Sequence, residues 1–268
     1  MTWHKKREID VAVIAITHEK KSDFFKNILE IKLKGVEVYD MPSLYEELSG
    51  KVPVMHIRDS WFLNVSFSGI KKNIYTQKIE RFIDISLCLS GLIITLPIIL
   101  ITSVLTKLGS KGKIFYIQER VGLNGKCFKL IKFRSMIVDA EAEGATWAIE
   151  GDSRITKVGK IIRKLRIDEI PQLWNVLKGD LSLIGPRPER PEFVSTLEKE
   201  IPYYSVRHSV KPGITGWAQV NYRYGASKKD TFEKLQYDLY YIKNKSLLLD
   251  IVILIKTVKV VLLGSGAR

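Results

Sequence analysis

The feature that most constrains this chain is an uncharged run of 22 residues, Ile85–Thr106, in a sequence otherwise rich in charge. A helix of this length would reach ~33 Å, enough to cross the hydrocarbon core of a bilayer. Pro97 lies near its middle, where a proline removes a backbone hydrogen bond and kinks a helix. Basic residues flank the run on both sides: Lys71, Lys72, Lys78 and Arg81 before it, and Lys107, Lys111 and Lys113 after it.

Positive charge tends to stay on the cytoplasmic side of a membrane, so basic residues at both ends favour a bent hairpin that enters one leaflet and returns. We assign Arg81, Asp84 and Pro97 to this hairpin, and expect the Thr95 hydroxyl to bond a carbonyl that the proline leaves free. A straight span, with the preceding residues on the other side of the membrane, is the second interpretation. A core helix of a soluble protein is the third. Leu247–Leu263 is apolar but interrupted by charges, which favours an amphipathic helix at the membrane interface over a core helix.

The first 70 residues predict a small α/β unit. Ile9–Ile16 and Val36–Tyr39 are short apolar runs typical of buried strands, and the helix-periodic stretch Lys20–Lys34 separates them. A second helix is expected over Ser43–Leu48, with Ser43 as its N-cap. This order predicts a parallel sheet. Because no glycine-rich loop follows the first strand, we expect a scaffold rather than a nucleotide site.

The remainder of the chain, 109–268, is dense in charge, glycine and proline, and predicts short elements. Two strands are expected over Ile114–Gln118 and Phe128–Phe133, around a turn that contains two glycines. Two short helices are expected over Val158–Leu165 and Ile170–Leu177.

The charge balance narrows the class of partner. The chain has 43 Lys and Arg against 29 Asp and Glu, a net charge of +14, which implies nucleic acid, acidic lipid or phosphorylated substrates. No basic recognition helix or aromatic RNA platform is evident, so we expect no nucleic acid partner. The two cysteines and four histidines show no zinc-ligand spacing, and the polar start, Met1–Asp10, is not a secretory signal.

An acidic pair is the first candidate for chemistry. Asp168 and Glu169 precede Pro171, a residue tolerated in the first turn of a helix. Asp168 is therefore expected near a helix N-cap, where the dipole would lower its pKa and keep it ionised. An ionised carboxylate can accept a phosphoryl group covalently, and its neighbour could share a divalent metal. An ordinary helix cap explains the segment as well, and the segment alone favours the cap.

Three other segments are consistent with phosphate binding. Arg187 stands between two prolines, and a guanidinium on a stiff loop can clamp phosphate oxygens. Lys132 and Arg134 alternate with apolar residues, so one face could bind phosphate while the other packs. Trp217 lies in a glycine-punctuated loop that could shape a pocket at the membrane interface. A rigid turn, a charged edge strand and a structural loop explain the same segments.

Taken in order, these segments resemble the bacterial sugar transferase family, the monotopic polyprenyl-phosphate phosphoglycosyl transferases. The resemblance implies a mixed α/β fold in three parts. Residues 1–70 would form a partial Rossmann-like module of the longer members, 71–108 the re-entrant membrane hairpin, and 109–268 a mainly helical catalytic domain with short strands. The matching stretches are KIERFIDISLCLSGLIITLPIIL, QERVGLNGKCFKLIKFRSM, LRIDEIPQLWNVLKGDLSLIGPRPE and VKPGITGWAQVNYRYG, with LKGVEVYDMPSLYEELSGKVPV in the first part.

The resemblance also implies a reaction. Asp168 would attack the β-phosphate of a UDP-sugar, release UMP and hold the phosphosugar until undecaprenyl phosphate accepts it. Asp168, Glu169 and Asp139 would hold Mg²⁺ or Mn²⁺. The expected substrate-binding residues are Arg187, Lys132, Arg134, Arg163 and Asp238.

The implied setting is the cytoplasmic face of a bacterial inner membrane, in contact with lipids, at the first membrane step of exopolysaccharide, capsule or lipopolysaccharide synthesis. A homodimer is expected by analogy with longer members. Two other functions stay open: a non-enzymatic adaptor at the membrane surface, and a conventional glycosyltransferase that releases UDP. The sequence does not indicate which sugar is transferred.

Overall fold

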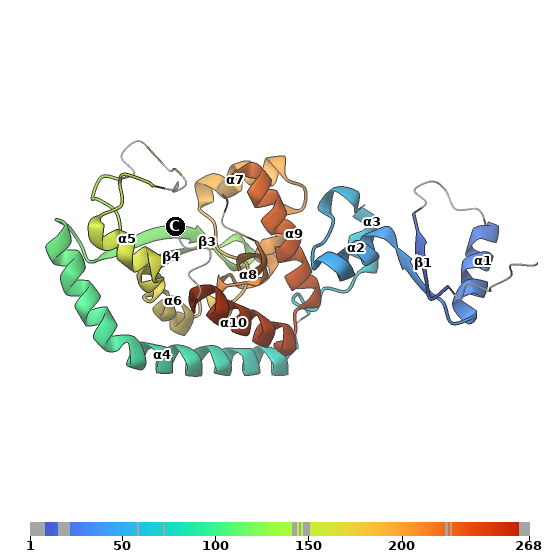
Figure 1. Cartoon of the computed structure of the whole chain (residues 1–268), viewed down its shortest axis with the longest axis horizontal. Helices are drawn as coiled ribbons and strands as arrows, with labels where there is room; N and C mark the ends of the chain where they lie inside the picture. The colour runs from blue at the N-terminus through green and yellow to red at the C-terminus, as the bar shows by residue number, and fades with distance from the viewer. Residues whose placement is uncertain are drawn as a thin grey trace, which may run out of the picture.

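The computed structural model describes residues 9–15, 22–57, 59–71, 73–140, 144, 146, 151–222, 225 and 227–262. Within these residues the fold is mixed, with helices throughout and short strands that pair two by two. Figure 1 shows a β-α unit at one end, a body of short elements at the other, and a long bent helix beneath the body.

The N-terminal unit has the predicted β-α-β-α order. It consists of β1 (Val11–Ile14), α1 (Ser22–Leu33), β2 (Glu37–Asp40) and α2 (Met41–Ser49), and β1 pairs with β2 in parallel. The predicted ends at Ile16 and Lys20 lie outside the described residues.

The predicted cap of α2 was wrong by three positions. Asp40, not Ser43, is the N-cap, and its carboxylate accepts a hydrogen bond from the Ser43 N–H at 2.8 Å. The helix can begin before Pro42 because a proline in the first turn gives up an N–H that would have no helical partner there.

The segment after α2 packs into the main core. It contains η1 (Val54–His56) and α3 (Asp59–Asn64), and Val52 and Val54 are buried against α9 (Lys228–Asn244). The Val52 N–H donates to the Gln236 carbonyl at 3.0 Å. Residues ahead of the predicted boundary at 70 thus share a core with the C-terminal part.

The long apolar run forms one helix, α4 (Ile74–Gly109), with Pro97 inside it. The helix bends toward its C-terminal end (Figure 1), as expected where a proline removes a backbone hydrogen bond. It is a single bent helix, in place of two helices joined by a turn. The Thr95 hydroxyl donates to the Gly91 carbonyl at 2.6 Å, so it does not bond the Ile93 carbonyl that Pro97 leaves free.

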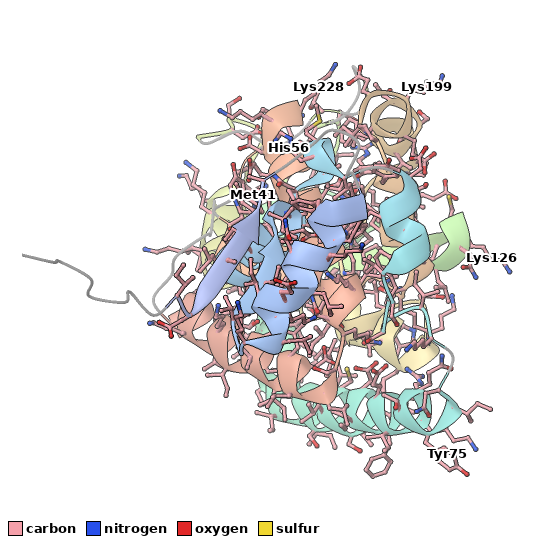
Figure 2. The ribbon with its side chains drawn as sticks, turned by 90° about the vertical axis from the view of Figure 1, so that its right-hand side faces the viewer. Met41, His56, Tyr75, Lys126, Lys199 and Lys228 are labelled. Atoms are coloured by element: carbon pink, nitrogen blue, oxygen red, sulfur yellow. The ribbon has the colours of Figure 1, made fainter. Side chains whose placement is uncertain are left out.

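Much of α4 faces outward. The helix is long and apolar enough to cross a membrane, and Tyr75 at its start points away from the body (Figure 2). This is a sign of membrane association by length and composition. Its large apolar side chains that are at least half exposed include Phe82, Leu89, Ile93, Ile94, Leu96, Leu100, Ile101 and Val104.

Two residues predicted for the hairpin attach α4 to the body. The Arg81 guanidinium donates to the Val176 and Leu177 carbonyls, both at 2.6 Å, at the end of α6 (Gln172–Lys178). The buried Asp84 carboxylate accepts from the Leu183 N–H at 3.0 Å, in β5 (Ser182–Ile184). A cation on the last carbonyls of a helix satisfies acceptors that have no partner within the helix.

The C-terminal part begins with the predicted antiparallel hairpin, β3 (Phe115–Val121) and β4 (Cys127–Phe133), around η2 (Leu123–Gly125). The turn requires left-handed backbone at Asn124 and Gly125, with φ of 54° and 74°, which asparagine and glycine tolerate best. The remaining elements, besides α6, β5 and α9, are α5 (Lys157–Lys164), η3 (Ile167–Glu169), α7 (Pro191–Glu200), η4 (Tyr204–Ser209), β6 (Gly213–Thr215), α8 (Trp217–Asn221) and α10 (Leu247–Leu262).

Two apolar clusters hold these elements. The larger joins α9 and α10 to η4, β5, α7 and the segment after α2, and includes the fully buried Leu239, Ile242 and Ile253. The smaller joins α4 to the hairpin through Cys88, Leu130, Val176 and Leu181. Each fully buried aliphatic side chain contributes ~1.5–3 kcal/mol of transfer free energy.

Candidate active site

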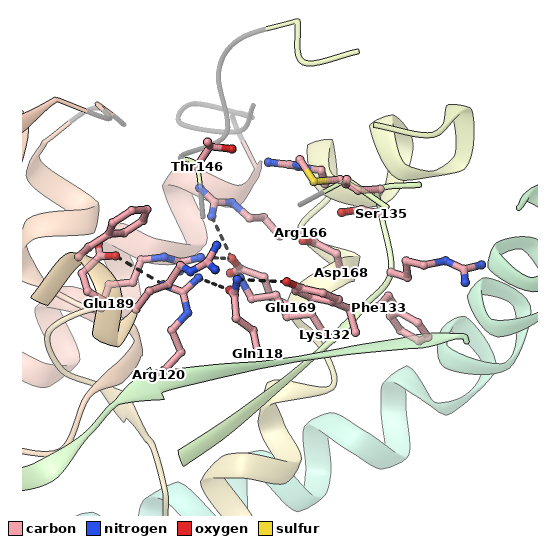
Figure 3. Close-up of a pocket in the computed structure, with 18 of the residues that line it drawn as sticks. Gln118, Arg120, Lys132, Phe133, Ser135, Thr146, Arg166, Asp168, Glu169 and Glu189 are labelled. Carbon is pink, nitrogen blue, oxygen red and sulfur yellow. Dashed lines mark hydrogen bonds and ion pairs between the residues drawn. The ribbon is translucent and has the colours of Figure 1, made fainter. Parts of the chain in front are cut away.

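A cavity of about 480 Å³ lies between the β3–β4 hairpin, η3, the loop before α7, and α9 (Figure 3). Elements far apart in the sequence meet here. The cavity lining includes every residue for which a role in metal or substrate binding was predicted: Lys132, Arg134, Asp139, Arg163, Asp168, Glu169, Arg187 and Asp238.

The β3–β4 hairpin supplies one wall. Tyr116 of β3 lies opposite Lys132 of β4. Gln118 and Arg120 lie on the same face of β3 as Tyr116, because side chains two positions apart on a strand point the same way. All four line the cavity, and Figure 3 shows Gln118, Arg120 and Lys132 rising from the hairpin. Arg120 donates to the Gln118 Oε1 at 2.5 Å and to the Pro188 carbonyl at 3.1 Å. These bonds fix the guanidinium against the loop that carries Arg187.

The acidic pair does not cap a helix. Asp168 and Glu169 lie in the single turn η3, and the N-cap position of α6 is Pro171. The chain reaches η3 through Arg166, whose φ of 58° ends α5 and redirects the backbone. The left-handed conformation costs a residue with a side chain ~1–2 kcal/mol, and such strain is concentrated at functional sites.

The two carboxylates have different surroundings. The Arg187 guanidinium donates to Glu169 Oε1, and Arg166 Nη1 lies 3.7 Å from the same atom. Burial acts to raise the pKa of Glu169, but the positive charges of Arg187, Lys132 and Arg166 outweigh it and lower this pKa. Glu169 is therefore the firmly ionised member of the pair.

Asp168 shows the opposite shift. Burial, and then the negative charge of Glu169, raise its pKa above the ordinary value. No hydrogen bond or ion pair to its carboxylate is formed within the described part of the chain. The prediction that a helix N-terminus would lower this pKa was wrong, because Asp168 precedes the helix and burial beside Glu169 dominates.

Cations surround the pair. Burial, and then the charges of Arg187 and Arg120, lower the pKa of Lys132 to about 8. Its ammonium has no ion-pair partner among the described residues. Many like charges in one cavity are unfavourable until an anion neutralises them, so the cavity suits a polyanion such as a diphosphate. The lining holds further cations for which the sequence predicts no role: Arg120, Arg154, Arg166, Arg190, Arg207 and Lys234.

Asp238 acts on a neighbouring arginine. Its buried carboxylate lies 2.9 Å from Arg207 Nη2, and Arg207 also donates to the Arg187 carbonyl at 2.8 Å and the Tyr204 hydroxyl at 2.6 Å. Burial raises the pKa of Asp238 to about 6, although Arg207 opposes this shift. The Asp238–Arg207 pair thus holds the backbone of the Arg187 loop.

Arg134 and Asp139 are placed differently from the other predicted residues. The buried Arg134 donates through Nη2 to the Ser110 carbonyl at 2.8 Å and the Thr106 carbonyl at 3.3 Å, at the end of α4. Among the described residues, no three His, Cys, Asp or Glu side chains lie close enough to hold a metal, so Asp139 does not complete a carboxylate triad. Asp168 and Glu169 are adjacent in the cavity and offer two hard oxygen ligands of the kind Mg²⁺ prefers.

One missed cation, Arg120, could have been found by alternation. It follows Tyr116 and Gln118 at every second position, on the same face of β3, although the predicted strand ended at Gln118. Arg207 carries no such signal, because its role depends on contacts with Asp238 and the Arg187 loop.

The described residues thus combine a long apolar helix, fastened to a small body, with a cation-lined cavity around an acidic pair. Residues 75–264 match the family described as bacterial sugar transferases, and the chain belongs to this family.

Relatives support the assignment. A protein of Aeromonas hydrophila named UDP-N-acetylgalactosamine-undecaprenyl-phosphate N-acetylgalactosaminephosphotransferase is 47% identical, over 88% of this chain and 55% of the relative. Proteins named UDP-glucose:undecaprenyl-phosphate glucose-1-phosphate transferase are 40% identical in Xanthomonas campestris pv. campestris and 38% in Escherichia coli (strain K12). These cover 88% and 81% of this chain, and 49% and 45% of the relatives. The chain thus spans about half the length of these relatives.

Proposed function

We propose that this protein transfers a phosphosugar from a UDP-sugar to undecaprenyl phosphate and releases UMP, as the first membrane step of a polysaccharide pathway. The observation that carries the proposal is the acidic pair inside a cation-lined cavity: Arg187 engages Glu169, while Asp168 has no donor within the described residues. The names of the relatives supply the donor and acceptor classes.

In the first step, an Asp168 oxygen attacks the β-phosphorus of the UDP-sugar. The bond from that phosphorus to the bridging oxygen breaks, and UMP leaves with the electron pair. The phosphosugar stays on the carboxylate as an acyl phosphate. In the second step, a phosphate oxygen of the lipid attacks the same phosphorus and frees Asp168.

The cavity residues supply charge and orientation for both steps. Lys132, Arg187 and Arg120 would meet the diphosphate oxygens, where preorganised cations stabilise charge that develops in the transition state. A divalent ion such as Mg²⁺ or Mn²⁺, held by Asp168 and Glu169, would neutralise further diphosphate charge.

We place the protein at the cytoplasmic face of the bacterial inner membrane. Lys245, just before α10, pairs with Glu80 of α4 at 2.7 Å. Leu248, Ile251 and Ile255 of α10 are each more than half exposed. Together these helices offer apolar surface for one leaflet, and the lysines that flank α4 would lie among its acidic head groups. The bend of α4 suits a re-entrant placement, in which both ends return to the same side.

The N-terminal unit is proposed to be the end of a Rossmann-like module, on the parallel pairing of β1 with β2 around α1. A homodimer, as expected for longer members, stays a prediction. N-acetylgalactosamine is the first donor sugar to test, because the relative named for it is 47% identical and those named for glucose are 40% and 38% identical.

The test is an assay in lipid nanodiscs with undecaprenyl phosphate, Mg²⁺ and either UDP-N-acetylgalactosamine or UDP-glucose. We expect release of UMP, loss of that release in Asp168→Asn, and a gain of one phosphosugar mass on the Asp168 peptide when the lipid is omitted. Release of UDP would indicate a conventional glycosyltransferase. If the wild type binds the lipid nanodiscs but releases no nucleotide, the protein would be a membrane adaptor.

A further inference from the structure

Asn175 lies outside the cavity lining and makes an unusual set of contacts. It sits on α6, is 1% exposed, and its amide bridges to two backbone groups of β4. The Ile131 N–H donates to Asn175 Oδ1 at 3.0 Å, and Asn175 Nδ2 donates to the Lys129 carbonyl at 2.7 Å. A longer contact joins Nδ2 to Asp180 Oδ2 at 3.4 Å.

These contacts occupy an edge of β4 where a further strand could pair. Among the described residues β4 pairs only with β3, so its other edge has no strand partner. The bonds from Arg134 N to the Ile114 carbonyl and from Gly122 N to the Lys126 carbonyl set the ladder so that Lys129 and Ile131 point their backbone groups away from β3. The amide of Asn175 meets one donor and one acceptor of that edge, as a residue of a third strand would.

The same amide joins the two halves of the acidic site. Ile131 directly precedes Lys132, which lines the cavity. On the other side, a tight turn joins η3 to α6: Ile170 N donates to the Ile167 carbonyl at 3.1 Å and Leu173 N to the Ile170 carbonyl at 3.0 Å. Asn175 therefore sits on the helical segment that carries the acidic pair and holds the strand that carries Lys132.

Apolar packing alone would not set this register. Leu130 of β4 and Val176 of α6 belong to one buried cluster, which attaches the helix to the hairpin. The free energy of apolar burial is roughly proportional to the area buried and has no preferred direction. Apolar packing would therefore permit the strand to shift along the helix. A shift would break the two hydrogen bonds of the planar Asn175 amide, because these require short distances and near-linear angles.

We propose that Asn175 is a positioning residue, which sets Lys132 against the Asp168–Glu169 pair by fixing the register of β4 on α6. The inference rests on the proposed function and deepens it. Asn175 itself touches neither substrate nor the reacting atoms.

The kinetic test compares Asn175→Ser and Asn175→Asp with the wild type in the UMP-release assay. We expect kcat to fall roughly 10- to 100-fold, as for a displacement of about 1 Å, with the KM for the UDP-sugar changed by less than about threefold. Asn244→Ser is the matched control, since Asn244 also bonds a backbone carbonyl, that of Tyr240, far from the acidic pair in the sequence, and should keep the wild-type kcat.

A double-mutant cycle separates positioning from general support of the fold. In a Lys132→Gln background, Asn175→Ser should reduce kcat by less than about threefold more, because residues that act through one another are not additive. Additive losses, a wild-type kcat in both Asn175 variants, or loss of cooperative unfolding in both would overturn the inference.

Hydrogen exchange gives a reading that needs no turnover. Exchange across Lys129–Phe133 should rise in Asn175→Ser while exchange in α9 stays at the wild-type rate, and an unchanged β4 would contradict the proposal. Failure of the proposed function has a different signature, namely a wild-type protein that shows no Asp168-dependent release of UMP.

Discussion

At the scale of single residues, one arginine contributes to the different pKa values of two adjacent carboxylates. Arg187 engages Glu169 and helps to lower its pKa, whereas burial and the charge of Glu169 raise that of Asp168. Sites that use two carboxylates commonly divide their roles in this way. The residue proposed as nucleophile is the one with no hydrogen-bond donor among the described residues, so its lone pairs stay available.

Arg166 combines a backbone role with a side-chain role, and two substitutions separate them. Arg166→Gly and Arg166→Ala both remove the charge near Glu169, but only glycine relieves the left-handed strain. We expect Arg166→Gly to be more stable than Arg166→Ala by about 1 kcal/mol in thermal unfolding, with similar losses of activity. Equal stability of the two variants would show that the turn is unstrained.

His208 should make stability depend on pH. Burial, followed by the charge of Arg207, lowers its pKa from 6.5 to about 4 in the folded protein. Between these values the unfolded chain binds a proton that the folded chain does not, so the contribution of His208 is complete above pH 6.5 and is lost as the pH falls toward 4.

The size of this effect is roughly 3 kcal/mol between pH 7.5 and pH 4. It is measured as the difference in unfolding free energy between the wild type and His208→Gln across that range. Comparing the two proteins cancels the opposite contribution of Asp238, whose pKa is raised. If the difference in unfolding free energy stays constant across the range, the pKa of His208 is the same in the folded and unfolded states.

At the scale of elements, the bent helix is attached to the body at both ends. Arg81 and Asp84 hold its first half to α6 and β5, and Arg134 holds its last turn to the end of β4. The same helix presents apolar side chains outward. The helix is therefore joined directly to elements next to the acidic pair and Lys132.

Arg81 tests this attachment. Arg81→Ala leaves two carbonyls at the end of α6 without their donor, and we expect a loss of ~1–3 kcal/mol in unfolding free energy in nanodiscs. Lys78→Ala is the control, because Lys78 is exposed on the same helix and should change stability by less than about 0.5 kcal/mol. A similar loss of unfolding free energy in both variants would indicate that the loss comes from weaker contact with lipid, not from the two carbonyls of α6.

At the scale of the whole molecule, the core crosses the boundary predicted at residue 70. Val52, Val54 and Ile57 are buried with α9 and α10, and Glu46 pairs with Lys243 of α9 at 2.5 Å. The described residues between 9 and 45 contribute less, since many of the large apolar side chains of β1 and α1 are exposed.

Truncation distinguishes these two parts. A chain that begins at Glu46 should keep cooperative unfolding, whereas one that begins at Lys71 should lose it. Removing three buried side chains forfeits ~1.5–3 kcal/mol each, a large share of a typical stability of about 5–15 kcal/mol. Equal melting temperatures for the two truncated proteins would contradict this account.

Local signals predicted much of the fold. The apolar run became α4, the two glycines around Asn124 became the hairpin turn, and both short helices formed within two residues of their expected bounds. These features depend on neighbours in the sequence. The predicted caps at Ser43 and Asp168 were wrong, because the start of a helix also depends on nearby prolines and on how the preceding turn is packed.

By itself, the sequence determined the long apolar helix with its central proline, the excess of positive charge and the residue types that the site would use. Composition and period are local properties, readable without the fold. The tertiary structure alone decided which residues met in the cavity, that Asp168 lies before its helix with a raised pKa, and that Asn175 sets Lys132 opposite the pair. Burial, distance and charge between segments remote in sequence exist only once the chain has folded.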